Sequence, residues 1–206
     1  LVNGMVGIGT GFSTNIPLYD PYKIINNILK KLDNKDAPYT LLIPHYNNFK
    51  GTIVKIDKMN YITKGLYKLN KHENKLEITE LPIGKWTDDY IKFIQENILK
   101  DEKHNFITDY ENHSTDSEVH IICKVTDEFI FDFEHSTPDE NGTNYVEKHM
   151  KLTSNKSLTN LHLYNKDNQI QKFKDVYAIM DHHYYVRYDL YGKRKEYMLD
   201  ILKNKI

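Results

Sequence analysis

Four short runs rich in β-branched and aromatic residues follow one another between residues 52 and 79, with turn residues between them. Runs of this length and spacing predict strands, and they cover residues 52–56, 61–63, 65–69 and 75–79. Helical patterns lie on both sides of this strand region. We therefore expect an α+β fold, in which an antiparallel sheet and packed helices lead into a long helix at the end.

The first and last helical patterns are the clearest. Asp20 and Pro21 are typical of an N-cap followed by the first helical residue, and isoleucine and leucine then repeat at helical spacing through residue 33. The last pattern runs from Phe173 to Leu202 and predicts a long helix rich in tyrosine. Its tyrosines are expected to serve ordinary core or coiled-coil packing.

The segments between these two helices are predicted from shorter signals. Thr87 is expected to cap a helix that contains Tyr90 and Ile94. The other predictions are a polar loop at 101–116, a strand at 117–125, a short helix at 126–134, a loop containing Pro138 and Asn141-Gly142, and a strand pair at 159–164 and 169–172.

The composition is that of a folded domain, with 39% hydrophobic and 28% charged residues among 206. No apolar run is long enough to cross a bilayer, and no signal peptide is visible. The chain starts with Leu1 rather than methionine, so we expect it to be a segment of a longer protein. Cys123, its single cysteine, excludes an internal disulfide and a multi-thiolate zinc site. We expect Cys123 to be a buried strand thiol in a reducing, intracellular compartment.

The net charge of −1 does not exclude binding to nucleic acid, because a local basic surface matters more than the total. Lysines are concentrated at residues 50–75 and 148–156. Lys50, Lys148, Lys151 and Lys156 could neutralise phosphates, which sets register without reading sequence. Any single surface lysine is more often simply solvated, so the collective basic surface is the safer prediction.

Two other kinds of site are disfavoured. The glycines of residues 4–11 lack the spacing of a dinucleotide-binding loop, and Pro17 falls where the phosphate-binding helix would run. The ten histidines show no metal-ligand spacing, and adjacent His182 and His183 point in different directions on a helix. A histidine-dependent metallohydrolase is therefore a weak alternative.

Several separated motifs resemble one family. The opening segment, Leu1 to Pro17, contains Gly7-Ile8-Gly9-Thr10-Gly11 and resembles the segment after the winged helix of type IIA DNA topoisomerases. It is similar to the eukaryotic and large-DNA-virus branch of that family. Further matches follow in the family's order across nearly the whole chain: Asn48-Phe49-Lys50-Gly51-Thr52-Ile53, Glu77-Ile78-Thr79-Glu80-Leu81-Pro82, Trp86-Thr87 and Tyr191-Gly192-Lys193-Arg194-Lys195-Glu196.

This resemblance implies a domain organisation. Residues 1–17 would join the winged helix to the tower of the DNA gate, residues 18–172 would form the tower, and residues 173–206 would begin the coiled coil. The nucleophilic tyrosine of the family lies upstream of the opening motif, so no catalytic residue is expected in this chain. Arg187-Tyr188 stands at the wrong place to be that nucleophile.

The resemblance also implies DNA-binding residues. Ile8 corresponds to the isoleucine that wedges between base pairs, and Gly7, Gly9 and Thr10 surround it. An apolar wedge unstacks a base step and kinks the duplex. Lys50, Lys151 and Lys156 are expected to meet phosphates, although residues 151–160 depart from the usual residues of the lysine- and hydroxyl-rich turn that they resemble. Without the resemblance, Ile8 would be interpreted as a core residue in a glycine-rich turn.

The expected function is therefore to bind and bend double-stranded DNA within a homodimeric topoisomerase that passes one duplex through a transient break in another. The segment itself is expected to hold no cofactor, while the parent would use ATP and Mg²⁺ bound elsewhere. No membrane partner is expected, and the location would be the nucleus or a viral replication site. The alternative is a stand-alone nucleic-acid-binding module without catalytic activity.

Overall fold

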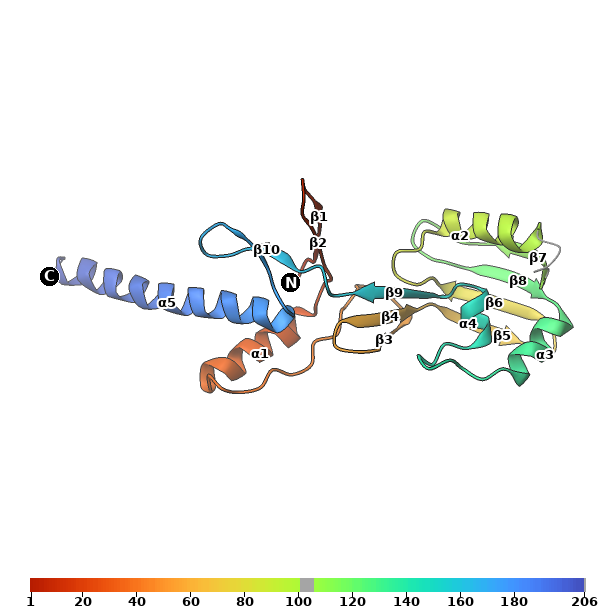
Figure 1. Ribbon diagram of the computed structural model, residues 1–206, viewed down its shortest axis with the longest axis horizontal. Coiled ribbons are helices and arrows are strands. Elements are labelled where there is room, and N and C mark those ends of the chain that lie inside the picture. Colours follow the sequence, from red (N-terminus) through yellow and green to blue (C-terminus); the bar gives the residue numbers. More distant parts are fainter. Residues whose placement is uncertain (101–105, 206) are drawn as a thin grey trace. The chain divides into compact units, whose positions relative to one another are not determined.

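The computed structural model describes residues 1–100 and 106–205. The chain forms two compact units, Leu1–Tyr46 with Ser157–Ile206, and Asn47–Lys156 (Figure 1). Both units combine helices with antiparallel strand pairs, which confirms the predicted α+β class. The long helix and the strand pair near the end of the chain are also confirmed.

The first unit holds two hairpins and two helices. Strands β1 (Met5–Ile8) and β2 (Ser13–Ile16) form one antiparallel hairpin, and β10 (His162–Tyr164) and β11 (Ile170–Lys172) form the other. Helix α1 (Pro21–Asp33) and the start of α5 (Val176–Lys203) share one apolar core. Its buried members are Ile16, Tyr19, Ile24, Leu42, Leu161, Phe173, Val176, Ile179 and Met180.

Helix α1 begins as predicted, because the side chain of Asp20 accepts a 2.9 Å hydrogen bond from the backbone nitrogen of Tyr22. Its buried face is less apolar than the sequence suggests, since it includes Asn27 and Lys31. Asn27 exchanges hydrogen bonds with the backbone of Thr40, at 2.8 Å and 3.2 Å. These bonds compensate the amide for its lost contact with water.

The second unit contains both larger sheets. Strands β3 (Thr52–Lys55), β4 (Asn60–Lys64) and β9 (Thr153–Ser157) form a three-stranded sheet in that order. Strands β5 (Leu66–Asn70), β6 (Lys75–Glu80), β8 (Ile121–Val125) and β7 (Ile107–Asn112) form a four-stranded antiparallel sheet. The four strands predicted between residues 52 and 79 are thereby confirmed.

Helices cover one face of the four-stranded sheet. Helix α2 (Thr87–Phe93) continues into a π-helical turn, η1 (Ile94–Leu99), and lies over the sheet (Figure 1). Helices α3 (Asp127–His135) and α4 (Tyr145–His149) complete the core. Cys123 on β8 is fully buried there, as predicted, and burial raises the pKa of its thiol to about 12.

The polar loop predicted at 101–116 is partly wrong, because residues 107–112 form β7; residues 101–105 lie outside the described residues. Only Ile107 of this strand is fully buried, and the rest is polar, as is common at a sheet edge. Its polar composition therefore resembles that of a loop. The predicted strand at 117–125 is shorter, since β8 begins at Ile121.

Two further predictions need correction, and one helix was not predicted. Thr87 is the first residue of α2 rather than its cap, and no side chain caps this helix. Helix α4 was missed, although Asn144 and Glu147 form a capping box that marks its start. The stretch 151–160, expected to be a turn, contains strand β9, whose pairing is supported by a 3.3 Å hydrogen bond from Thr63 to the Ser154 carbonyl.

Candidate nucleic-acid interface

The hairpin of β1 and β2 carries the predicted wedge residue at its end. Ile8 pairs with Ser13 in the last register position before the turn, and the backbone nitrogen of Gly9 donates a 2.8 Å hydrogen bond to the Phe12 carbonyl. Gly11 supplies the positive φ of +82° that the turn requires. This turn places Ile8, Gly9 and Thr10 together at the tip, with Gly7 one residue away.

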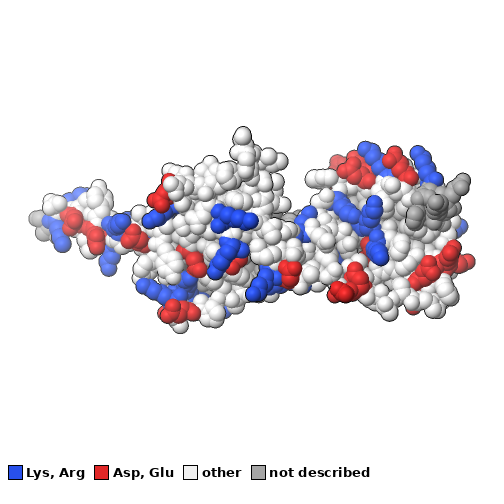
Figure 2. Space-filling model, viewed as in Figure 1, with Lys and Arg blue, Asp and Glu red and all other residues white. Residues whose placement is uncertain are grey.

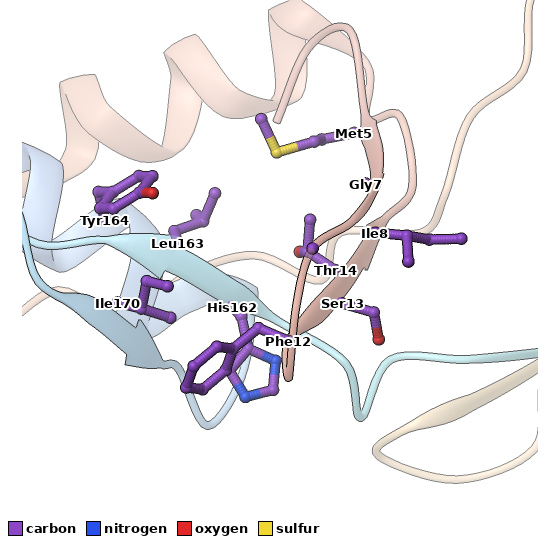
Figure 3. Close-up of a pocket in the computed structure, with 11 residues that line it drawn as sticks. Met5, Gly7, Ile8, Phe12, Ser13, Thr14, His162, Leu163, Tyr164 and Ile170 are labelled. Atoms are coloured by element: carbon purple, nitrogen blue, oxygen red, sulfur yellow. The ribbon is translucent and has the colours of Figure 1, made fainter.

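The side chain of Ile8 is 92% exposed. Ile8 is therefore not a core residue. The interpretation of Ile8 as a core residue in a glycine-rich turn, which would hold without the family resemblance, is wrong. Figure 3 shows the side chain of Ile8 pointing away from Leu163, Tyr164 and Ile170 of the other hairpin. An isoleucine at the end of a paired strand with its side chain exposed is accessible to a partner.

Gly7 and Gly9 are not required by the packing of the hairpin itself. A Cβ atom added at Gly7 would meet only the methyl group of Thr14, at 3.6 Å, and one at Gly9 would meet only the Phe12 carbonyl, also at 3.6 Å. Both distances are ordinary van der Waals contacts. Gly4 differs, because it has a φ of +63° and an added Cβ would lie 2.9 Å from the Ile16 carbonyl oxygen. The backbone conformation and packing of the hairpin require glycine at Gly4. At Gly7 and Gly9 they do not, and the absence of side chains there leaves the backbone accessible from outside.

Asn160 fastens the hairpin to the rest of the first unit. Its carbonyl accepts a 2.9 Å hydrogen bond from the backbone nitrogen of Asn15, and its side chain donates a 2.8 Å bond to the hydroxyl of Ser13. The buried side chain of Ile16 anchors the other end of β2 in the core. The tip is therefore held from several directions although its own residues are exposed.

A pocket of about 270 Å³ lies between the two hairpins of this unit. Apolar side chains dominate its lining, as Figure 3 shows for Met5, Phe12, Leu163, Tyr164 and Ile170. The rings of Phe12 and His162 meet edge to face at 6.0 Å. The residues that line the pocket include no Lys, Arg, Asp or Glu.

The three predicted lysines lie in the second unit and differ in surroundings. Lys50 has a carboxylate partner, because its Nζ lies 3.4 Å from Oε1 of Glu118. Its backbone nitrogen also donates a 3.1 Å hydrogen bond to Glu80. Lys50 is thus partly neutralised, although this exposed pair is weak enough for a phosphate to compete with it.

Lys151 and Lys156 lie close to a lysine that sequence reasoning missed. The ammonium group of Lys85 donates a hydrogen bond to the carbonyl of Lys151, and Lys156 reaches the backbone at Gly84. The sequence could have indicated Lys85, because it directly precedes the Trp86-Thr87 motif that resembles the family. Figure 2 shows several basic side chains side by side near the centre of the visible face of this unit, while basic and acidic side chains alternate along its upper edge.

Among residues 1–100 and 106–205, no group of three or more His, Cys, Asp or Glu side chains is arranged to hold a metal ion. Within the same residues, every helix is too short or too polar to span a bilayer.

Arg187 donates a 2.9 Å hydrogen bond to the Tyr191 hydroxyl, one turn further along α5.

Comparison with known proteins identifies the relatives of this chain. The family model that describes the A subunit of DNA gyrase/topoisomerase IV matches residues 1–206. The chain is 39% identical over 208 residues to the mitochondrial DNA topoisomerase 2 of Dictyostelium discoideum, covering all of this chain and 15% of the relative. It is 38% identical over 206 residues to DNA topoisomerase 2 of Plasmodium falciparum, again over all of this chain and 14% of the relative.

A solved structure agrees with these relatives. It is the crystal structure of the Plasmodium falciparum topoisomerase II DNA-binding, cleavage and re-ligation domain, with a TM-score of 0.83 and 38% sequence identity. The similarity covers 98% of this chain and 26% of that one. The chain therefore spans about a quarter of the solved domain and about one seventh of the two relatives.

Proposed function

Because the chain belongs to the family of the DNA gyrase/topoisomerase IV A subunits, we propose that it is the tower region of the DNA gate of a type II DNA topoisomerase. There it binds and bends double-stranded DNA. Residues 1–17 join the tower to the winged helix, residues 18–172 form the tower, and residues 173–206 begin the coiled coil. This region contributes DNA grip rather than bond cleavage, and the nucleophilic tyrosine lies outside it.

The observation that carries this proposal is the exposed isoleucine at the hairpin tip. With 92% of its side chain exposed and glycines on both sides, Ile8 can enter a base step without a neighbouring side chain in the way. Unstacking a step costs about a few kcal/mol, which the contacts of the bent duplex with more protein surface offset. Gly7, Gly9 and Thr10 then line the groove, and Lys50, Lys151 and Lys156 neutralise phosphates along the duplex.

The parent enzyme passes one duplex through a transient double-strand break in another. It acts as a homodimer, so two copies of Ile8 kink the duplex symmetrically about the break. ATP and Mg²⁺ are bound by other parts of the parent. The enzyme works in the nucleus or at a viral replication site.

A stand-alone nucleic-acid-binding module is the alternative. The relatives favour the enzyme, because this chain aligns with only 14–15% of the length of two topoisomerases. The mass of the natural gene product separates the two proposals. A product several times larger than 24.4 kDa, with peptides from both sides of this segment, supports the enzyme. A product near 24.4 kDa leaves only the binding module.

The bending role is tested in the full-length gene product with a duplex labelled by fluorescent dyes at its two ends. We expect Ile8→Ala to reduce bending, measured as lower energy transfer between the dyes, while the protein stays folded. Ile25→Ala is the matched control, since Ile25 is a half-exposed isoleucine on α1 of the same unit. Unchanged bending in Ile8→Ala would falsify the wedge.

A further inference from the structure

Three lysines of the second unit lie in or beside a pocket of about 260 Å³ next to α2. Lys85 and Lys151 line this pocket, and Lys156 reaches its edge at Gly84, where an added Cβ atom would lie 2.8 Å from the Lys156 ammonium nitrogen. They come from separate places in the chain: the turn before α2, the residues after α4, and strand β9. Their convergence is therefore produced by the tertiary structure.

Buried contacts hold the framework of this lysine cluster in place. Tyr90 of α2 is 3% exposed, and its hydroxyl donates a 2.7 Å hydrogen bond to the carbonyl of Met150, directly before Lys151. The Lys151 ammonium lies 4.2 Å from the centre of the Phe93 ring, which orients it by a cation–π interaction. Lys85 in turn donates a hydrogen bond to the Lys151 carbonyl.

Lys151 occupies a backbone conformation that favours glycine. It has a φ of 50° and follows the C-cap of α4. The nitrogen of Leu152 donates a 2.8 Å hydrogen bond to the Glu147 carbonyl, and that of Lys151 a 3.2 Å bond to the Lys148 carbonyl. This is the Schellman arrangement, in which glycine is the usual residue at the position of Lys151. A lysine here is less favourable to the fold than glycine, which points to a use for its side chain.

The charges of Lys85 and Lys151 repel each other. Burial, followed by the neighbouring charge of Lys151, lowers the pKa of Lys85, and burial lowers the pKa of Lys156. Asp89 also lines the pocket, yet no carboxylate in the described part of the chain lies within ion-pair distance of the three ammonium groups. A bound anion would relieve this repulsion.

An aromatic ring completes the surface. The indole of Trp86 lines the same pocket and is 75% exposed, although a large apolar ring is usually more buried. Aromatic rings beside lysines are typical of surfaces that follow a nucleic-acid strand, where the cations meet phosphates and the ring packs against a base or sugar.

We propose that Lys85, Lys151 and Lys156 form a phosphate-binding site for a DNA strand, with Trp86 packed against the same strand. This proposal rests on the proposed function and deepens it, because it adds Lys85 and Trp86 to the phosphate contacts of Lys151 and Lys156 and joins them in one site that does not depend on the wedge. The shared chemistry is a phosphate oxyanion, and a free polyphosphate is the other source of it.

The site provides its own reporter, because Trp86 is the single tryptophan of the chain. We expect a short DNA duplex to change the tryptophan emission of the 206-residue chain at low salt, with saturation. Inorganic tripolyphosphate should produce a change only at much higher concentration, since it lacks the sugar and base that meet the ring. Saturation by tripolyphosphate at equal or lower concentration than the duplex would identify a free polyphosphate as the ligand and overturn the assignment to DNA.

Lys151→Gly is the most informative variant, because glycine suits the backbone at this position and folding is preserved. We expect it to weaken duplex binding by about threefold to tenfold and to reduce the slope of log affinity against log salt by about 1. Lys124→Gln is the matched control. It removes one charge from β8 in the same unit, and alternation places Lys124 on the sheet face opposite the buried Cys123 and Val125.

The outcomes separate this site from the wedge. Equal losses in Lys151→Gly and Lys124→Gln would show a non-specific charge effect and overturn the site. Unchanged emission of Trp86 at DNA saturation would do the same while leaving bending by Ile8 intact. Conversely, loss of bending in Ile8→Ala with normal emission changes at Trp86 supports both sites. If Ile8→Ala leaves bending unchanged and Trp86 still responds to duplex, the phosphate site stands and the wedge fails.

Discussion

The ammonium group of Lys31 on α1 donates a hydrogen bond to the carboxylate of Asp181 on α5, and only 8% of the Lys31 side chain is exposed. Tyr39 donates a 2.6 Å hydrogen bond to the same carboxylate, and its ring centre lies 4.8 Å from the lysine nitrogen. Burial alone would lower the pKa of Lys31, but the bonds and charges of Asp181 and Tyr39 outweigh it and raise the pKa. This pair joins the two helices of the first unit.

Removing Asp181 should cost more stability than removing Lys31. Asp181→Ala leaves a buried ammonium group without its carboxylate, and we expect a loss of about 3 kcal/mol in the free energy of unfolding. Lys31→Met keeps most of the volume and leaves a carboxylate that is 39% exposed and still bonded to Tyr39, so about 1 kcal/mol is expected. Urea unfolding at pH 7 measures both. Equal losses in the two variants would contradict this account.

The glycines of the opening hairpin should separate into two kinds. Gly4→Ala is expected to lower stability by about 1–3 kcal/mol, because of its positive φ and its approach to the Ile16 carbonyl. Gly7→Ala should leave stability within about 0.5 kcal/mol, since the added methyl meets only Thr14, yet it should weaken DNA bending. Thermal unfolding and the dye-labelled duplex measure the two effects. A destabilised Gly7→Ala would show that the hairpin, rather than DNA, requires this glycine.

Cys123 should make stability fall in alkaline solution. Its folded-state pKa is raised to about 12, whereas a free thiol has a pKa of about 8.5. The unfolded chain therefore loses this proton first, so the contribution is complete below about pH 8.5 and decreases by up to about 1.4 kcal/mol per pH unit up to about pH 12. Cys123→Ala lacks this decrease. Unfolding by urea at pH 8, 9 and 10 compares the two slopes, and identical slopes would contradict the raised pKa.

The elements that the sequence predicts well are those whose signals are local. Asp20 and Pro21 mark the start of α1, and the short β-branched runs mark β3 to β6, because caps, turns and side-chain periodicity act within a few residues. Strand β7 has no such signal. It is a polar edge strand that exists through its pairing with β8, which no neighbouring residue reveals.

The residues of the candidate site also differ in whether a local sequence signal predicts them. The residues around Ile8 were named from the sequence, because a continuous motif carries them, but the hairpin that they form was not predicted. The lysine cluster was predicted only in part, as Lys151 and Lys156 were named without Lys85. These side chains converge because Tyr90 on α2 bonds the end of α4, a contact between residues 60 positions apart.

The sequence by itself determined the family and the α+β class and led to the proposal of Ile8 as the wedge, since these depend on composition, periodicity and motifs that are continuous along the chain. Only the tertiary structure decided that Ile8 is exposed rather than buried, that Lys50 has a carboxylate partner, and that Lys85 and Lys151 line one pocket with Lys156 at its edge. Exposure and electrostatic environment depend on which distant residues lie within a few ångströms. Those distances follow from packing of the whole chain, and neighbours in sequence do not specify them.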